Sequence, residues 1–497
     1  MLTPKKTSLQ PSRLSAWVVL FLISLLLIFL WAGTSFFQFI NEATSALMAF
    51  FGPLYLILGF LAVILAVFLS IHPISKRKLG KGKPEYGLGS WIAMLYSTGM
   101  GSGLLLRAVQ EPVYFLENPP RSSNLSAEVF ALQYTFFHWG FTPWAFYGLT
   151  AVLVGWFYYR REKNFLFSDL LFPDSSSPKW TADLIDLLVI MTTFFGVLAS
   201  VGLGSRQLLS SSEFWGGVNW DAKWAIIPLS LISTAATLSA FLGVRKGIKR
   251  LSDLNIAGAT LLLSITFLMG PIGSTLELFF ESLFSYFISW TPMSLNLGSW
   301  SVSNDFLQNW TVFYWAFWLA WAPFTGIFIA RISHGRSIRE VLLGTLLIPS
   351  LGTFLWFSIF GNHAFDLIAK QSLSAEELES VYSSIFVFFG QLPFAKVTQF
   401  LSTFFLATFL ITSIDSAIFV LSMYLDRGKR EPKKRIRFFW GASFFTLTAL
   451  VLWSGGEQLL LTISNILILS SLPFAVVFLP LLFFLFKNLK SITHENS

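Results

Sequence analysis

Apolar stretches long enough to cross a lipid bilayer recur along the whole chain, and they constrain its fold more than any other feature. A helix of about 20 apolar residues spans the hydrocarbon core, and it satisfies its own backbone hydrogen bonds there. Because 54% of the residues are hydrophobic and only 12% are charged, little of the chain remains for a soluble domain. The sequence therefore predicts an all-α membrane protein. An enzyme is not expected, because the five His and zero Cys form no pattern of a metal site or a nucleophile.

The apolar stretches divide into twelve predicted transmembrane spans. We place them at residues 15–37, 49–70, 90–116, 127–158, 183–208, 224–244, 252–286, 309–332, 339–361, 393–425, 437–454 and 458–486. The first stretch has no small-residue cleavage site close behind it, so we expect a membrane helix there and not a cleaved signal peptide. The two longest segments between spans, 287–308 and 362–392, could each hold a short surface helix.

Positive charge is concentrated in alternate loops. If every second loop faces the cytoplasm, that side receives all of the 34 Lys and Arg except Arg107, Arg121, Arg206, Lys223, Lys370 and Lys396. Cytoplasmic loops are enriched in Lys and Arg, so we expect a protein of the plasma (inner) membrane with both termini in the cytoplasm. The same loops account for the net charge of +8. We therefore expect contacts with lipid headgroups and no binding of nucleic acid.

The eighth span contains an aromatic cluster. Trp318 and Trp321 are close enough in sequence to share one helix face, with Phe317 beside them. If the span begins near Gln308, Trp318 lies roughly 15 Å deep, near the middle of a core about 30 Å thick. Tryptophan usually gathers at the membrane surface. The depth of this cluster instead favours binding of a desolvated cation on the indole faces.

Two predicted spans carry helix-breaking residues. The third contains glycine at 99, 101 and 103, and the eighth contains Pro323 followed by Gly326. Each glycine costs a helix about 1 kcal/mol, and unwound backbone is tolerated in a bilayer only where it lines a cavity or is buried in protein. The glycines alone are equally consistent with close helix packing. Breaks in corresponding positions of two halves favour an inverted-repeat secondary transporter with a binding site at mid-membrane.

A set of motifs spread through most of the chain resembles the betaine/choline/carnitine transporters. The motifs are Gly99-Met-Gly-Ser-Gly103, Glu111-Pro112, Phe136-Phe-His-Trp-Gly140, Pro143-Trp-Ala-Phe-Tyr147, Gly202-Leu-Gly204, Lys246-Gly-Ile-Lys-Arg-Leu-Ser252, Trp310-Thr-Val-Phe-Tyr-Trp315, Ala330-Arg-Ile-Ser333 and Thr412-Ser-Ile-Asp-Ser416. The resemblance implies a leucine-transporter-like core of two inverted five-helix repeats and, commonly, a homotrimer. The implied parts are two N-terminal helices in 1–84, the first repeat in 85–286, a surface segment in 287–308, the second repeat in 309–486 and a short cytoplasmic tail in 487–497.

The resemblance also implies where a trimethylammonium substrate binds. In the family an aromatic box surrounds this group, and the matching positions are Trp139, Trp144, Tyr147, Phe317, Trp318 and Trp321. The same site includes the unwound segment at Met100, Gly101 and Gly103. A quaternary ammonium has no N–H to donate, so ring faces must hold it, each contributing up to about 2 kcal/mol when desolvated. Phe317 departs from the tryptophan usual in the family, and a Phe face attracts a cation less strongly.

Sodium-coupled members of the family bind one ion between the unwound part of helix 3 and helix 10. The matching positions are Ser97, Met100, Phe409, Thr412 and Ser413. Hydroxyl and carbonyl oxygens suit a hard cation, although a hydroxyl inside a helix can instead bond back to its own backbone. A second family site matches Thr193 and Phe324, with Val197 where another hydroxyl is expected. We therefore expect sodium as the coupling ion, bound at the first site.

Arg107 lies within the third span, where the family usually has an aromatic residue. A charge inside a span marks a functional site by default. Three interpretations are open. Arg107 pairs with Glu111 one turn further on, it attracts the carboxylate of a zwitterion, or it supplies a built-in positive charge in place of an ion.

These patterns together predict a secondary transporter that imports a trimethylammonium compatible solute, most simply glycine betaine, by sodium-coupled alternating access. The alternative within transport is a sodium-independent exchanger or uptake carrier for carnitine or choline. From a different class, a membrane osmosensor or receptor with a vestigial pore is the remaining interpretation. No cofactor other than the coupling ion is expected.

Overall fold

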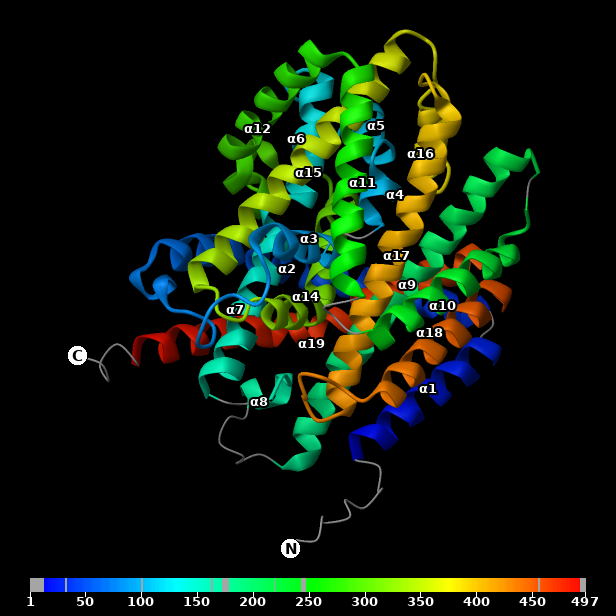
Figure 1. The fold of residues 1–497 in the computed structure, drawn as a ribbon. Helices are drawn as coiled ribbons and strands as arrows, with labels where there is room; N and C mark the ends of the chain where they lie inside the picture. Colours follow the sequence, from blue (N-terminus) through cyan, green and yellow to red (C-terminus); the bar gives the residue numbers. More distant parts are fainter. Residues whose placement is uncertain are drawn as a thin grey trace, which may run out of the picture.

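The structure is a computed structural model that describes residues 13–31, 34–99, 102–161, 164–171, 178–218, 220–242, 247–454 and 456–491. Throughout these ranges the regular elements are helices (Figure 1), apart from one isolated bridge between Lys78 and Ser337. Ten helices of the described chain are long and apolar enough to cross a membrane. The predicted all-α membrane fold is therefore confirmed.

Most of the predicted spans correspond to one long helix each. These helices are α1 (Arg13–Trp31), α2 (Thr34–Ile71), α9 (Lys179–Gly216), α10 (Ile226–Leu242), α11 (Ile248–Met269), α14 (Phe313–Ile332), α15 (Ile338–Ala369), α17 (Ala395–Leu425), α18 (Lys434–Ser454) and α19 (Gly456–Ser491). The short helices α8 (Phe167–Leu171) and α16 (Ser384–Gly390) lie in the connections between them, and α13 (Asn304–Phe306) forms the beginning of the span that contains α14.

The third and fourth spans are divided into shorter helices. The third consists of α3 (Leu88–Gly99), α4 (Gly103–Arg107) and α5 (Gln110–Glu117). The turn residue Ser102 precedes α4, in the region where the glycines predict an interruption, and residues 100 and 101 lie outside the described residues. The fourth consists of α6 (Ala127–Trp139) and α7 (Phe141–Arg161), separated at Gly140. A Cβ at Gly140 would lie 2.5 Å from the carbonyl oxygen of Phe136 and 2.6 Å from the ring of Phe354, so only glycine fits this close contact with α15.

The prediction of one span over 252–286 is wrong in its extent. Helix α11 ends at Met269, and a separate helix α12 (Ile272–Leu295) follows, crossing the predicted boundary at residue 286. The cause is Gly270-Pro271, because proline lacks a backbone N–H and disfavours helical geometry in the residue before it. Gly270 accordingly has an extended backbone, with φ −94° and ψ −176°.

The predicted break at Pro323 is also wrong. Helix α14 continues through Pro323 to Ile332, and the irregular part of this span is instead a π-helical stretch at Leu307–Val312. A proline inside a helix removes one hydrogen bond and adds one steric contact, and surrounding protein can hold the helix together. Here α14 is buried almost throughout its length, against α7, α9 and α19.

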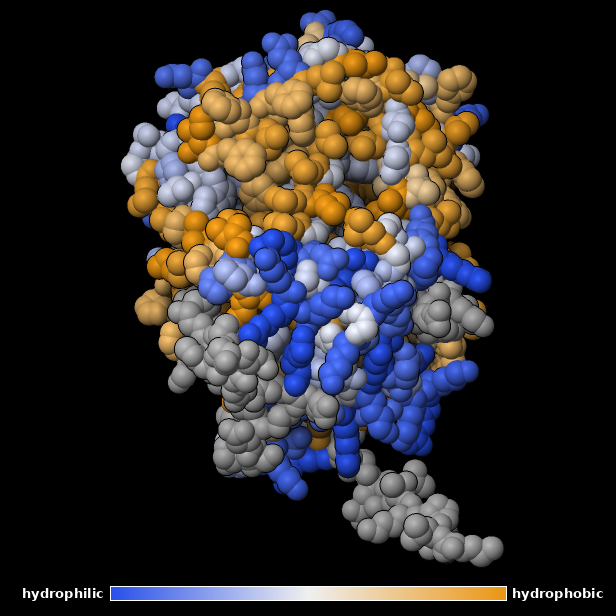
Figure 2. All heavy atoms as spheres, turned by 60° about the vertical axis from the view of Figure 1, so that its left-hand side comes forward, coloured by the Kyte–Doolittle hydropathy of each residue, from blue (hydrophilic) through white to orange (hydrophobic). Residues whose placement is uncertain are grey.

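Helix α14 lies at the centre of the molecule, with α7 packed along it (Figure 1). Helix α17 packs against α9, α10 and α11, and α19 packs against α2, α9 and α14. Large apolar side chains are exposed along α1, α2 and α12, for example Leu20, Phe50 and Phe284. Figure 2 shows such residues spread over much of one face, as expected for a surface that contacts lipid.

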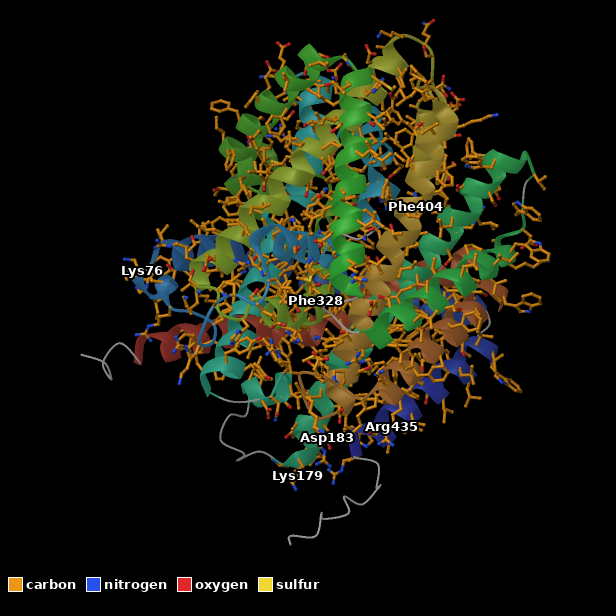
Figure 3. All side chains as sticks on the ribbon, in the orientation of Figure 1. Lys76, Lys179, Asp183, Phe328, Phe404 and Arg435 are labelled. Atoms are coloured by element: carbon orange, nitrogen blue, oxygen red, sulfur yellow. The ribbon has the colours of Figure 1, made fainter. Side chains whose placement is uncertain are left out.

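Charged loops that are far apart in sequence meet at one side of the molecule. Arg331 donates to Glu431 at 2.9 Å and to Glu85 at 3.5 Å, and Arg430 also pairs with Glu85. Arg437 joins the same network through Glu431 at 3.3 Å. Figure 2 shows a hydrophilic area below the apolar one, and Figure 3 places Lys179, Asp183 and Arg435 at the end where α1 begins. The three loops that contain Arg331, Glu85 and Glu431, all predicted from their positive charge to face the cytoplasm, therefore lie together in the structure.

Candidate functional site

A cavity of about 460 Å³ lies where the third span meets α2, α6, α9, α14, α17 and α19. Gly99 and Gly103 border it at the interruption, and aromatic side chains of α6 and α14 form its wall. A second cavity of about 690 Å³ adjoins it, since Val381 and Tyr382 line both. The described residues on either side of the predicted interruption, Gly99, Ser102 and Gly103, therefore line a cavity, which is where irregular backbone is tolerated inside a membrane protein.

Two tryptophans of the cavity wall are oriented by hydrogen bonds from behind. Helix α6 ends at Trp139, whose Nε1 donates to Glu111 Oε2 at 3.0 Å. Trp318 Nε1 donates to the carbonyl oxygen of His138 at 3.0 Å. The rings of Trp139 and Trp318 are 5.1 Å apart and inclined at 70°, so one presents its face where the other presents its edge.

The structure separates the six predicted box residues into two groups. Four of them line the cavity: Trp139, Phe317, Trp318 and Trp321. Trp144 and Tyr147 do not line it, because they are fully buried behind Gly99, with Tyr96 stacked on Trp144 at 6.0 Å. A Cβ at Gly99 would lie only 2.7 Å from the Trp144 ring. The two residues thus support the interrupted backbone and do not face the space beyond it.

Of the three predicted residues in the unwound segment, Gly103 lines the cavity. A Cβ there would lie 3.2 Å from the Trp139 ring, so the absence of a side chain lets that indole pack against the backbone. Met100 and Gly101 lie outside the described residues.

Sequence reasoning missed Tyr314 and Phe313, which both line the cavity. Tyr314 is stacked on Trp318 at 5.8 Å and 16°, and its hydroxyl donates to Glu111. Its position four residues before Trp318 was the available signal, because residues four apart share a helix face.

Arg107 does not pair with Glu111, so that interpretation is wrong. Its Nη1 donates to Gln110 Oε1 at 2.6 Å, and its guanidinium lies 5.9 Å from the centre of the Trp310 ring. The helix is irregular between α4 and α5, since residues 108 and 109 belong to neither helix. The regular spacing that would bring positions 107 and 111 together is therefore lost. Arg107 is half-buried and lines the cavity.

The hydroxyl groups predicted to bind the first sodium ion differ in their partners. Thr412 donates to the carbonyl oxygen of Thr408 at 2.7 Å and accepts from Asn255 Nδ2 at 2.8 Å, which is the helix back-bonding considered above. Ser413 lines the cavity, and Ser97 is fully buried with no hydrogen-bond partner for its Oγ among the described residues. Phe409 is buried on the same helix as Thr412.

The residues predicted for the second ion lie on two helices that pack together, Thr193 on α9 and Phe324 on α14. Both are buried, and the Thr193 hydroxyl has no hydrogen-bond partner in the described part of the chain. Val197, one turn along α9, is buried and offers no oxygen. The site as described thus supplies one unpaired hydroxyl.

These features define a polytopic helical membrane protein with an internal aromatic cavity built around an interrupted helix. Its lining combines aromatic faces, one guanidinium, two asparagine side chains and a few hydroxyl groups. Among the described residues no group of three or more His, Asp or Glu is placed to hold a metal ion. Such a cavity suits a small solute that carries both an apolar cation and an anion.

Comparison with known proteins identifies the family. Residues 13–494 match the family described as BCCT, betaine/carnitine/choline family transporter. The chain is 37% identical to the glycine betaine transporter OpuD of Bacillus subtilis (strain 168) over 459 residues, which cover 90% of this chain and 88% of that protein. It is 33% identical to the ectoine/hydroxyectoine transporter of Virgibacillus pantothenticus over 439 residues, 86% of each chain. The chain therefore belongs to the betaine/carnitine/choline transporter family, and it is a transporter and not an enzyme.

Among solved structures, the chain is similar to MhsT in complex with L-phenylalanine, with a TM-score of 0.49 and 13% sequence identity. The match covers 80% of this chain and 90% of that chain.

Proposed function

We propose that this protein imports glycine betaine by sodium-coupled alternating access. The observation that carries the proposal is the cavity in which Trp139, Trp318 and Trp321 line the same space as Arg107. Ring faces attract a trimethylammonium group, and a guanidinium binds a carboxylate. Glycine betaine carries both groups within one small molecule. Relatives named as glycine betaine transporters, at 37% and 32% identity, support the same solute.

Sodium coupling rests on oxygen atoms near the interruption. Helices α3 and α17 pack against each other, and Ser97 and Ser413 lie on them. A buried hydroxyl without a hydrogen-bond partner costs free energy unless something binds it. A sodium ion between these helices would satisfy the Ser97 oxygen. In this proposal the ion and the solute occupy adjacent sites, so each strengthens the binding of the other.

A sodium-independent exchanger of carnitine or choline is the second candidate, and two observations favour it. The Thr412 hydroxyl is already engaged by Thr408 and Asn255. Arg107 places a permanent positive charge at the cavity, where an ion-coupled transporter would need none. The two candidates differ in what drives net uptake.

Uptake of labelled glycine betaine into proteoliposomes separates these candidates. We expect accumulation when sodium is higher outside than inside, and little accumulation with potassium in its place. Equal uptake with and without sodium, together with acceleration by carnitine or choline inside the vesicles, would support the exchanger. Liposomes without protein provide the background.

We also propose a homotrimer in the plasma membrane with both termini in the cytoplasm. The absence of Cys allows the orientation to be measured with single introduced cysteines. Lys81 lies in a positively charged loop and Ser374 in a loop predicted on the opposite side, and both are exposed. In intact cells, a membrane-impermeant maleimide should label Ser374→Cys and spare Lys81→Cys, and the reverse result would invert the topology. The mass of the detergent-solubilised particle measures the number of subunits.

A further inference from the structure

A buried carboxylate lies directly behind the aromatic wall of the cavity. Glu111, in the first turn of α5, is 0% exposed. Its Oε2 accepts hydrogen bonds from Trp139 Nε1 at 3.0 Å and from the Tyr314 hydroxyl. Both of these aromatic residues line the cavity, whereas Glu111 does not. The rings therefore stand between the carboxylate and the space that would hold the solute.

His138 completes this cluster. Its Nδ1 lies 3.8 Å from Glu111 Oε1, and its Nε2 lies 3.1 Å from Thr311 Oγ1. Its carbonyl oxygen accepts from Trp318 Nε1, so a third ring of the wall is fixed by the same group of residues. Glu111 Oε1 has no hydrogen-bond partner among the described residues. Arg107, the nearest strong base in the sequence, donates to Gln110 instead.

Burying a carboxylate at this depth is costly, so its retention calls for a function. Two physical effects reach the cavity from this position. A carboxylate that accepts from an indole N–H draws the proton toward itself and leaves the ring more negative, which strengthens its attraction for a cation. The negative charge also acts directly across the thickness of the ring, where little water screens it.

We propose that Glu111 is a positioning residue that determines specificity: its negative charge, acting through Trp139 and Tyr314, makes the cavity select a trimethylammonium group over an uncharged group of the same shape. This inference rests on the proposed function, because it takes a trimethylammonium solute as the ligand. It assigns to Glu111 a role beyond holding the rings, namely setting the sign of the potential at their faces. Arg107 and Glu111 then act on the two ends of the solute separately.

The test compares glycine betaine with 3,3-dimethylbutanoate, in which a carbon atom replaces the quaternary nitrogen. Both ligands are measured by competition with labelled betaine on the purified full-length protein. Glu111→Gln keeps the size and an accepting oxygen and removes the charge. We expect it to weaken betaine binding about tenfold or more and to leave 3,3-dimethylbutanoate unchanged or tighter. Glu117→Gln, an exposed position on α5, is the matched control and should change neither ligand.

Two outcomes would overturn the proposal. If Glu111→Gln lowers the affinity for both ligands by the same factor, the residue only holds the rings in place. If neither changes, its charge does not reach the cavity. Should Glu111→Gln fail to fold, Trp139→Phe provides the second test, because it keeps a ring and removes the N–H that donates to Glu111. The ratio of betaine affinity to 3,3-dimethylbutanoate affinity must then fall at least about threefold. Wild-type protein that does not bind betaine at all would contradict the proposed function itself, which is a distinguishable result.

Discussion

At the scale of single residues, indole groups of the same wall are held in different ways. Trp139 and Trp318 are hydrogen-bonded from behind, to Glu111 and to the His138 carbonyl. The Trp321 N–H has no hydrogen-bond partner among the described residues, and this ring packs near Gly196, where a Cβ would lie 3.1 Å from Nε1. Rings fixed by hydrogen bonds keep their faces toward the cavity, while Trp321 depends on packing alone.

Replacing Trp318 or Trp321 by Leu should lower betaine affinity at least tenfold, about 1.4 kcal/mol each, while the protein still folds. Leucine preserves apolar character and removes the ring face that attracts the ammonium. Trp453→Leu serves as the control, because Trp453 is exposed on α18. Betaine affinity is measured on the purified variants. An unchanged affinity in both cavity variants would show that these tryptophans do not bind the solute.

Arg107→Gln should weaken the binding of betaine more than the binding of choline, because choline lacks the carboxylate. The ratio of betaine affinity to choline affinity should fall about tenfold. Combining it with Glu111→Gln should restore nothing, since Arg107 donates to Gln110 and not to Glu111. Arg121→Gln is a matched control, because that guanidinium also lies over a tryptophan, Trp300 at 3.9 Å, but does not line the cavity. Competition binding with the two ligands gives the ratio, and a ratio equal to that of the wild type rules out a carboxylate role.

At the scale of elements, interruptions in two spans position the site. The turn at Ser102 brings backbone to the cavity, and the break at Gly140 ends α6 at Trp139. Each break coincides with a glycine whose missing side chain lets a neighbouring ring approach the backbone, Trp144 at Gly99 and Phe354 at Gly140. The position of the aromatic wall is therefore set by helix ends as well as by hydrogen bonds.

Gly140→Ala should destabilise the protein by about 1–3 kcal/mol, because the new methyl group would collide with the Phe136 carbonyl and the Phe354 ring. It should also weaken betaine binding, since Trp139 precedes the altered position. The thermal unfolding midpoint in detergent measures the first effect and competition binding the second. At Gly273 on α12 an added Cβ has no neighbouring atom within 4 Å, so Gly273→Ala is the control and should behave like the wild type. Unaltered stability in Gly140→Ala would show that α6 and α7 tolerate a shift here.

Two adjacent hydroxyl residues of α17 should respond differently to alanine. Ser413→Ala is expected to raise the half-saturating sodium concentration for uptake severalfold, because Ser413 lines the cavity. Thr412→Ala should mainly reduce stability, by about 1–3 kcal/mol, because Asn255 Nδ2 loses its shorter hydrogen bond and keeps only the one of 3.4 Å to the Thr408 carbonyl. Ser402→Ala, a back-bonded buried serine on the same helix, is the control for sodium dependence. If Thr412→Ala alone changes the response to sodium, the assignment of Ser413 is incorrect.

At the scale of the whole molecule, ion pairs connect the loops on one side. Arg331, which is 3% exposed, has carboxylate partners in two other loops, Glu85 before α3 and Glu431 before α18. Backbone hydrogen bonds add to the connection, as Leu79 donates to the Arg336 carbonyl at 2.7 Å. The start of the interrupted span and the end of α14 are thus held together at a distance from the cavity.

Removing both partners of Arg331, in the double variant Glu85→Gln/Glu431→Gln, should lower the thermal midpoint by more than the sum of the two single changes. Each single variant leaves Arg331 one carboxylate, whereas the double variant leaves a buried guanidinium unpaired. Glu42→Gln, at an exposed position of α2, provides the control. Strictly additive shifts would show that the two pairs act independently.

The membrane class, the positions of most spans and the shared helix face of Phe317, Trp318 and Trp321 could be predicted from the sequence, and the family resemblance added Trp139. The first three depend on local hydropathy and on the spacing of residues along one helix, both of which can be read without neighbours. The end of α11 at Gly270-Pro271 was also readable, since proline acts on the residue before it.

The packing of the helices sets which residues face the cavity and which pair with one another. Trp144 and Tyr147 are aromatic like Trp139, yet they pack behind Gly99. Pro323 leaves α14 continuous because the helix is enclosed by protein on all sides, a property of its neighbours and not of the proline. Arg107 donates to Gln110, whereas Glu111, beyond the irregular residues 108 and 109, accepts from Trp139 and Tyr314. Contacts between distant segments arise only once the helices pack, so local patterns could not predict them.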